Sequence, residues 1–147
     1  MKKLLAHSRW FLVGVFFLSM ACNQPVDTTP SISDEEAEQI MNDFFTSLSE
    51  ADTTLLNNIT TDDFYLFEHD VIWNADSLLN LMSRTQGRVW VIKDFKVVKD
   101  GDIAHFNYFN ESANPVGRSW LESGVLVREE GDVKIKFLHS TKLYLNQ

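Results

Sequence analysis

The second half of the chain constrains its fold more than any other feature. Beyond Gly87 the sequence consists of long β-branched and aromatic runs separated by Gly-containing turns, a pattern typical of strands joined by hairpins. The dipeptides Asp100-Gly101 and Glu130-Gly131 both suit two-residue hairpin loops. Strands joined by such short loops pair antiparallel. The second half therefore predicts four consecutive antiparallel strands.

The first turn also predicts a strand register. If Asp100 and Gly101 form the loop, Lys99 faces Asp102, and the alternation of side chains separates a core face from a partly wet face. The expected core face carries Lys93, Phe95, Val97, Ala104, Phe106 and Tyr108. The expected wet face carries Trp90, Ile92, Asp94, Lys96, His105, Asn107 and Phe109.

The second turn predicts a polar pair inside an apolar stripe. With Glu130-Gly131 as the loop, Glu129 faces Asp132. Counting outward from that pair places Glu122 opposite His139 and Trp120 opposite Thr141.

The segment between the N-terminal region and Gly87 predicts three helices and one strand. Ser33 and Glu36 have capping-box spacing before apolar residues at helical spacing, which predicts a helix over 34–50. Asp52 opens a short second helix, the aromatic run 64–67 suits a strand, and Asn74 caps a third helix. Apolar residues of the second and third helices are Leu55, Leu56, Ile59, Leu78, Leu79 and Met82.

The N-terminal region has the pattern of an export signal. Basic Lys2, Lys3 and Arg9 precede the apolar run 10–18, which is short for a membrane span, and small residues lead to Cys22. The arrangement resembles a bacterial lipoprotein signal, in which the cysteine after the cleavage site carries lipid. Ala21 and Cys22 match that family, whereas Ser19 stands where it usually has Leu. The alternative is an ordinary secretory signal.

The expected organisation is a signal peptide over 1–21, a polar, proline-containing tether over 22–33 and one folded domain over 34–147. The resemblance to lipoprotein signals implies a lipid anchor on Cys22 and a domain outside the cytoplasm, in the bacterial cell envelope. Because Cys22 is the only cysteine, a lipid there leaves the domain no thiol nucleophile, disulfide or cysteine-ligated zinc.

The charge of the chain argues against two kinds of partner. The sequence has 13 basic and 21 acidic residues, and removal of the three basic residues in 1–21 leaves 10 against 21. A surface this acidic repels nucleic acid and bare anionic membrane.

The element order resembles that of a known family. An α+β chain with the order α-α-β-α-β-β-β-β is similar to the SnoaL-like branch of the nuclear transport factor two-like superfamily. The sequence segments 67–78, 120–123 and 134–141 look like those of small exported members of this family. This resemblance implies a cone-shaped roll, with three N-terminal helices packed on a curved antiparallel sheet around a pocket. It also implies an interior lined by carboxylates, histidines or tyrosines, and a homodimer through the exposed sheet face, with Phe109 and Ile92 as candidates.

Glu122 and His139 are the candidate catalytic residues. A carboxylate beside an imidazole in an apolar pocket can act as a general base with an orienting partner. Burial raises the carboxylate pKa while a neighbouring imidazolium lowers it, so either group can titrate near neutral pH. The structural alternative is a buried, mutually satisfied pair that holds the hairpin in register.

Five further residues are candidates for ligand contact. Glu68 shares a strand face with Phe64 and Leu66, so it rather than His69 is expected to face the pocket, and the alternative is a carboxylate that only lines the rim or caps a backbone end. The others are aromatic side chains that could stack on a flat ligand or donate a hydrogen bond, with plain packing as the alternative for each: Trp73, Trp90, Tyr108 and Trp120.

The sequence supports no cofactor and no metal site. The histidines downstream of the signal fall on separate elements, and no Gly-rich loop precedes a helix. Two hypotheses remain: a lipid-anchored domain that binds a small apolar or aromatic ligand, and an acid-base enzyme (isomerase, dehydratase or hydrolase) that uses Glu122 and His139.

Overall fold

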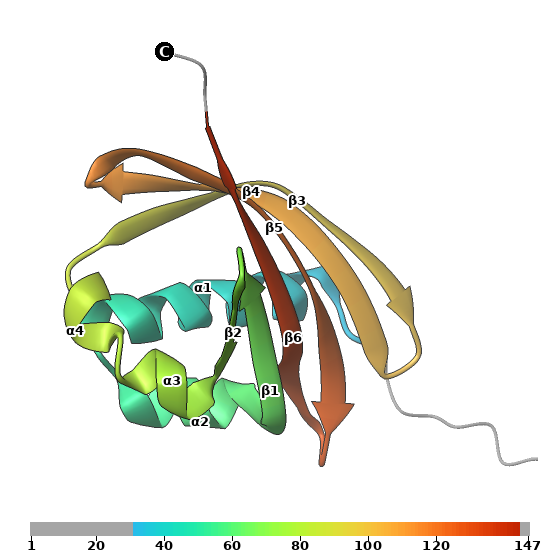
Figure 1. Ribbon diagram of the computed structural model, residues 1–147. Helices are drawn as coiled ribbons and strands as arrows, with labels where there is room; N and C mark the ends of the chain where they lie inside the picture. Colours follow the sequence, from blue (N-terminus) through green and yellow to red (C-terminus); the bar gives the residue numbers. More distant parts are fainter. Residues whose placement is uncertain (1–30, 145–147) are drawn as a thin grey trace, which may run out of the picture.

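The computed structural model describes residues 31–144, in which four helices cover the concave face of one curved six-stranded sheet (Figure 1). The α+β class and the helix-on-sheet roll are as predicted. The elements are α1 (Asp34–Glu50), α2 (Thr53–Ile59), β1 (Thr60–Glu68), β2 (Val71–Asn74), α3 (Ala75–Leu79), α4 (Met82–Thr85), β3 (Val89–Asp100), β4 (Ile103–Asn114), β5 (Val116–Glu129) and β6 (Asp132–Leu143).

The predicted helix starts are confirmed by side-chain caps. Ser33 and Glu36 form a complete capping box at α1, and Asp52 and Asn74 accept from backbone N–H groups at the starts of α2 and α3. The predicted third helix is broken into two short helices. The Leu81 N–H bonds back to the Leu78 carbonyl, three residues earlier, and this tight turn separates α3 from α4.

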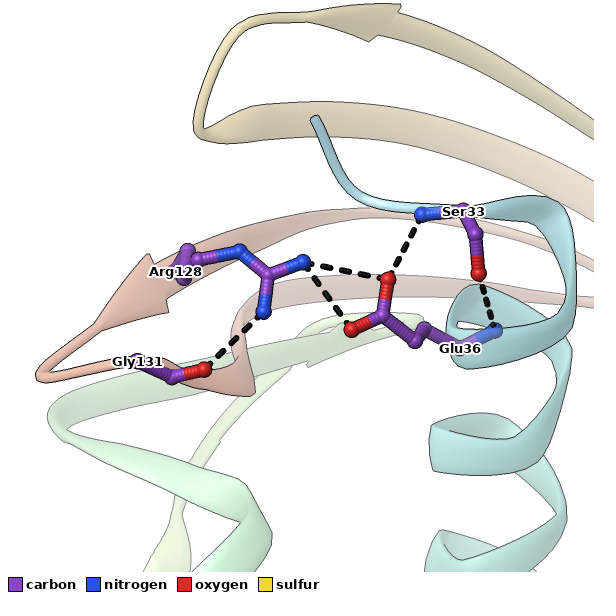
Figure 2. A network of polar contacts seen from close by, with 4 residues as sticks. All are labelled: Ser33, Glu36, Arg128 and Gly131. Carbon is purple, nitrogen blue, oxygen red and sulfur yellow. Dashed lines mark hydrogen bonds and ion pairs between the residues drawn. The ribbon is translucent and has the colours of Figure 1, made fainter. Parts of the chain in front are cut away.

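An ion pair ties the start of α1 to the last hairpin (Figure 2). The Arg128 guanidinium donates to both carboxylate oxygens of Glu36, at 2.9 and 3.0 Å, and to the Gly131 carbonyl at 2.9 Å. Glu36 also accepts from the Ser33 N–H, and both this bond and Arg128 lower its pKa. One carboxylate therefore caps the helix and anchors it to the sheet.

The sheet has the order β2-β1-β6-β5-β4-β3. It contains one more strand than expected, because Val71–Asn74 pairs with β1 as a short edge strand. The sheet is also not antiparallel throughout, since β1 and β6 pair in parallel. The long crossover from β1 through the helices and the hairpins makes that parallel pairing feasible.

The predicted register of β3 and β4 is wrong by two residues. Asp100 faces Ile103 and Lys99 faces Ala104, so the loop is Gly101-Asp102 rather than Asp100-Gly101. Gly101 takes the positive φ of 59° that this loop requires at its first position. Because side chains alternate along a strand, a shift of two residues leaves each side chain near the turn on its predicted side of the sheet. Phe106 and Tyr108 therefore lie in the core as expected.

A bulge in β3 reverses the faces of its first half. Asp94 has φ of 53°, and the register shifts between Lys93 and Lys96. Trp90 and Ile92 consequently lie on the inner face with Phe95, and Lys93 points outward, opposite to the prediction for all three.

A second bulge changes the register of β5 and β6. The loop at Glu130-Gly131 and the pair of Glu129 with Asp132 are confirmed. Farther from the turn, Leu126 faces Ile135 but Val125 faces Phe137, so β6 contains one extra residue. Beyond that point Glu122 faces Ser140, and the predicted pairs of Glu122 with His139 and of Trp120 with Thr141 are wrong.

A row of apolar residues crosses the inner face of the sheet and forms the floor of the cone. Leu66, Leu138, Gly124 and Phe106 lie side by side across β1, β6, β5 and β4 on the inner face. A Cβ at Gly124 would lie 2.6 Å from a ring carbon of Phe106 and 2.4 Å from the Phe137 carbonyl oxygen. The missing side chain therefore lets Phe106 and Leu138 meet above β5.

The folded core begins slightly before the predicted domain boundary. Ile32, which the sequence assigns to the tether, is fully buried in the core. In the described part of the chain, no helix has both the length and the apolar character to cross a membrane.

Replacement of Gly124 by alanine tests the packing of this row. We expect Gly124→Ala to lower the free energy of unfolding by about 1–3 kcal/mol, because the added methyl group overpacks the core. Urea denaturation measures the change, with Ser123→Ala on the neighbouring residue as control. An unchanged midpoint for Gly124→Ala would show that this contact is not tight.

Candidate active site

A polar row lies directly above the apolar row. Four inner-face residues face one another across β1, β6, β5 and β4, namely Glu68, Ser140, Glu122 and Tyr108. Ser140, Glu122 and Tyr108 are buried, and Glu68 is half-buried. Side chains directly opposite in a sheet share a face and lie close together, so the strand register itself assembles this row.

A cavity of about 110 Å³ opens above the polar row. Its polar lining comes from Glu68, Arg88, Asn110, Glu122 and Ser140, together with Thr85. The apolar lining comes from the helices and the sheet: Phe44, Phe45, Leu48, Leu66, Leu78, Leu81, Trp90, Trp120 and Leu138. The site is thus an apolar hollow with a few convergent polar groups, the usual form of a small-molecule site.

Glu122 is the central polar group of this cavity. The Asn110 amide donates to Glu122 Oε1 at 3.3 Å, and the Ser140 hydroxyl donates to the same oxygen at 3.2 Å. Among the described residues, no group donates to Oε2. When Glu122 is protonated, an O–H at Oε2 is therefore available to a ligand.

Burial raises the pKa of Glu122 from 4.5 to about 7. The bonds from Asn110 and Ser140 oppose this rise in pKa, because they stabilise the charged form, whereas nearby Glu68 adds to it. A carboxyl group with a pKa near neutrality can both donate and accept a proton at physiological pH.

The mouth of the cavity is charged. Arg88 lies with its guanidinium carbon 5.5 Å from the centre of the Trp90 ring. Burial lowers the pKa of Arg88, the nearby Arg118 lowers it further, and Glu68 raises it. Glu68 and Arg88 both line the cavity, and Arg118 lies on the inner face of β5, opposite Ser112.

The structure brings four of the predicted site residues together. Glu68, Trp90, Trp120 and Glu122 all line the cavity, and Glu68 shares the inner face with Phe64 and Leu66 as predicted. Trp90 reaches the cavity only because of the bulge at Asp94, which the sequence analysis did not anticipate.

Trp73 and Tyr108 are close to the cavity but do not line it. Trp73 is half-buried beside Leu66, and its buried Nε1 has no partner among the described residues. The Tyr108 ring stacks on Phe95 and Phe106, with ring centroids 5.7 and 5.9 Å apart. Burial raises the pKa of Tyr108 well above 10, and its hydroxyl finds no partner in the described part of the chain.

His139 lies outside the site. The extra residue in β6 turns it to the outer face, where it is exposed and faces Ser123 and Phe67. The predicted Glu122–His139 pair is therefore replaced by Glu122–Ser140.

The predicted dimer surface keeps only one of its two candidate residues. Phe109 is exposed on the outer face of the sheet, whereas Ile92 lies on the inner face. The homodimer stays a prediction.

Sequence reasoning missed Asn110, Ser140 and Arg88. Asn110 could have been found, because it follows Phe106 and Tyr108 in the alternation of β4. Ser140 was hidden by the bulge in β6, and Arg88 precedes β3 outside any periodic pattern.

The described residues contain no cluster of three or more His, Cys, Asp or Glu side chains that could hold a metal ion.

A wider depression, of about 850 Å³, lies on the surface between α1, α2 and the β5–β6 hairpin. Its lining includes the Glu36–Arg128 pair, whose charges already satisfy each other.

Comparison with known proteins decides the family. Residues 37–143 match the sequence model of the SnoaL-like domain. The chain belongs to the SnoaL-like family. No curated protein sequence is significantly similar to this SnoaL-like chain.

Solved structures show the same fold. An NTF2-like protein from Cytophaga hutchinsonii has a TM-score of 0.66 at 12% identity, covering 74% of this chain and 97% of that one. A candidate ketosteroid isomerase from Shewanella frigidimarina has a TM-score of 0.64 at 18% identity, with coverages of 74% and 96%. A candidate dehydratase of the NTF2-like family from Streptomyces avermitilis has a TM-score of 0.66 at 16% identity, with coverages of 76% and 96%.

Glu122 makes the stability of the SnoaL-like domain depend on pH. Because its folded pKa of about 7 exceeds its ordinary 4.5, the folded state holds the proton more tightly, and this stabilisation is lost as pH rises through 7. The loss is up to about 3 kcal/mol. Glu122→Gln, which mimics the neutral acid, should be more stable than wild type at pH 8 and similar to it at pH 5.

Urea denaturation of both proteins at the two pH values measures this difference. Glu38→Gln, which changes an exposed carboxylate on α1, is the matched control and should follow wild type. If wild type and Glu122→Gln lose equal stability between pH 5 and 8, Glu122 does not hold its proton as described.

Proposed function

We propose that the domain binds a small apolar or aromatic ligand in the cone. The observation that supports this best is Glu122, a buried carboxyl group with an unpartnered oxygen, at the base of an open and mostly apolar cavity. Burial of such a group is unfavourable unless something compensates for it. A ligand with a carbonyl or ether oxygen would accept a hydrogen bond from Oε2.

The size and walls of the cavity limit the ligand. The volume of about 110 Å³ is smaller than the roughly 150 Å³ of an apolar protein cavity that accommodates benzene. The hollow therefore holds no more than a single flat ring, and larger parts of a ligand extend through the mouth. Trp90 and Trp120 provide the flat apolar surfaces on which such a ring can pack.

An acid-base enzyme is the second candidate function. Glu122 with a pKa near 7 and Glu68 on the same row form a pair of carboxyl groups with different environments, which suits proton transfer. The relatives described as a candidate ketosteroid isomerase and a candidate dehydratase make this class reasonable, although their similarity extends only to the fold.

Binding of neutral aromatic fragments tests the first candidate. We expect ligand-detected NMR to show that small aromatic ketones bind, and that Trp90→Leu weakens binding about tenfold through loss of ring contact. Phe109→Leu on the outer face is the matched control and should bind as wild type. Failure of every aromatic fragment to bind would refute the proposal.

The same fragments distinguish binding from catalysis. In D₂O, an acid-base enzyme would exchange the C–H protons beside the ketone, and Glu122→Gln should abolish this exchange while changing affinity only a few-fold. A binding domain would leave those proton signals intact in wild type as well. Exchange that survives in Glu122→Gln would remove Glu122 from the reaction.

We also propose that lipid on Cys22 anchors the protein to a membrane of the bacterial cell envelope. The support is the sequence pattern around Ala21 and Cys22, which lies outside the described residues. In a bacterial host the wild-type protein should incorporate labelled fatty acid and sediment with membranes. Cys22→Ala should lose both properties, whereas Thr28→Ala should keep them. A soluble, unlabelled wild type would favour the ordinary secretory signal.

A further inference from the structure

The cavity mouth carries unpaired positive charge in an acidic protein. The chain has a formal net charge of −8. Its described ion pairs are Lys93–Glu111, Lys99–Asp34, Arg128–Glu36 and Lys136–Asp63, and none of them lies at the cavity mouth. Within the described residues, neither Arg88 nor Arg118 takes part in an ion pair. In the described part of the chain, Arg84, Lys96, Lys134 and Lys142 have no ion pair either, so what distinguishes Arg88 and Arg118 is their position on the inner side of the sheet, beside the cavity.

Strand register places Arg118 at the level of Trp90 and one step beyond Trp120. Arg118 faces Ser112, which faces Trp90, and all three lie on the inner side of the sheet. Arg88 precedes Trp90 in sequence and lines the cavity. Lys142 faces Trp120 on the same side, but its Nζ lies 5.3 Å from the centre of the Tyr144 ring and it does not line the cavity. Two carboxyl groups line the cavity, Glu68 and Glu122, and of these Glu68 interacts electrostatically with Arg88.

The layers of the cone therefore differ in chemistry. The apolar row at Gly124 forms the floor, the polar row at Glu122 follows, the tryptophans form the walls, and the arginines stand at the opening. A ligand whose ring occupies the hollow has its remaining group at the arginines. Arginine binds planar carboxylates through paired hydrogen bonds.

We propose that the ligand is an aromatic carboxylate, held with its ring between the polar row and the tryptophans and its carboxylate at Arg88 and Arg118. This inference rests on the proposed function, since it names the ligand class of the same site. A carboxylate suits the mouth better than a phosphate monoester, because the second negative charge of a phosphate would face Glu68.

Paired probes that differ only in the head group test this inference. Phenylacetate and phenylacetamide have the same ring and shape but differ in charge. We expect NMR titration to show phenylacetate binding at least about tenfold more tightly, with an advantage that shrinks at high salt. In the double variant Arg88→Gln/Arg118→Gln this advantage should disappear, while phenylacetamide binding persists and shows that the domain is folded.

The control removes two positive charges elsewhere. Arg84→Gln/Lys96→Gln changes exposed residues on α4 and the outer sheet face, so it should keep the preference for phenylacetate. Loss of the preference in this control would mean that net charge, and not the mouth, selects the ligand, and would overturn the inference.

Three other outcomes are informative. Equal affinities for phenylacetate and phenylacetamide in wild type would overturn the carboxylate inference and leave the proposed function standing. Tighter binding of phenyl phosphate than of phenylacetate would replace carboxylate by phosphate as the head group. Absence of binding by every aromatic probe, charged or neutral, would refute the proposed function and this inference together.

Discussion

The site depends on close packing at one residue without a side chain. Gly124 lets Phe106 and Leu138 meet above β5, and this contact seals the narrow part of the cone beneath Glu122. Glu122 is buried directly above this packed row, and the loss of hydration raises its pKa to about 7. A looser floor would hydrate this group and remove the property that distinguishes it from an ordinary surface glutamate. The chemistry of the site is therefore a consequence of core packing.

Two single-residue bulges decide which side chains reach the cavity. The bulge at Asp94 turns Trp90 inward, and the extra residue in β6 turns Ser140 inward and His139 outward. In a pleated strand one added residue exchanges the faces of everything beyond it. Without these bulges Glu122 would face His139 and one wall of the cavity would lose its tryptophan. The bulges thus act as positioning elements for the site.

Sequence reasoning reached the fold through local signals and missed what depends on tertiary packing. The helix caps at Ser33, Asp52 and Asn74 were predictable, because each satisfies backbone groups within its own turn. The loop at Glu130-Gly131 was predictable for the same reason. The bulges in β3 and β6 were not, since no residue type encodes them alone and the curvature of the sheet determines where they occur. Glu122 was found from its place in an apolar stripe, but its partner was not.

Glu68 interacts electrostatically both with Glu122 at the base of the cavity and with Arg88 at its mouth. Burial is the main cause of the raised pKa of Glu122, and the charge of Glu68 adds to it. Burial and Arg118 lower the pKa of Arg88, and the charge of Glu68 partly offsets that change, which favours the guanidinium cation. One half-buried carboxylate thus stabilises a neutral hydrogen-bond donor at the base and a positive charge at the mouth. Membership of the SnoaL-like family accounts for the cone but not for this polarity, since a fold does not specify its reaction. The polarity follows from the side chains on the inner rows, and it suits the ligand that we propose, which has an apolar end and a charged end.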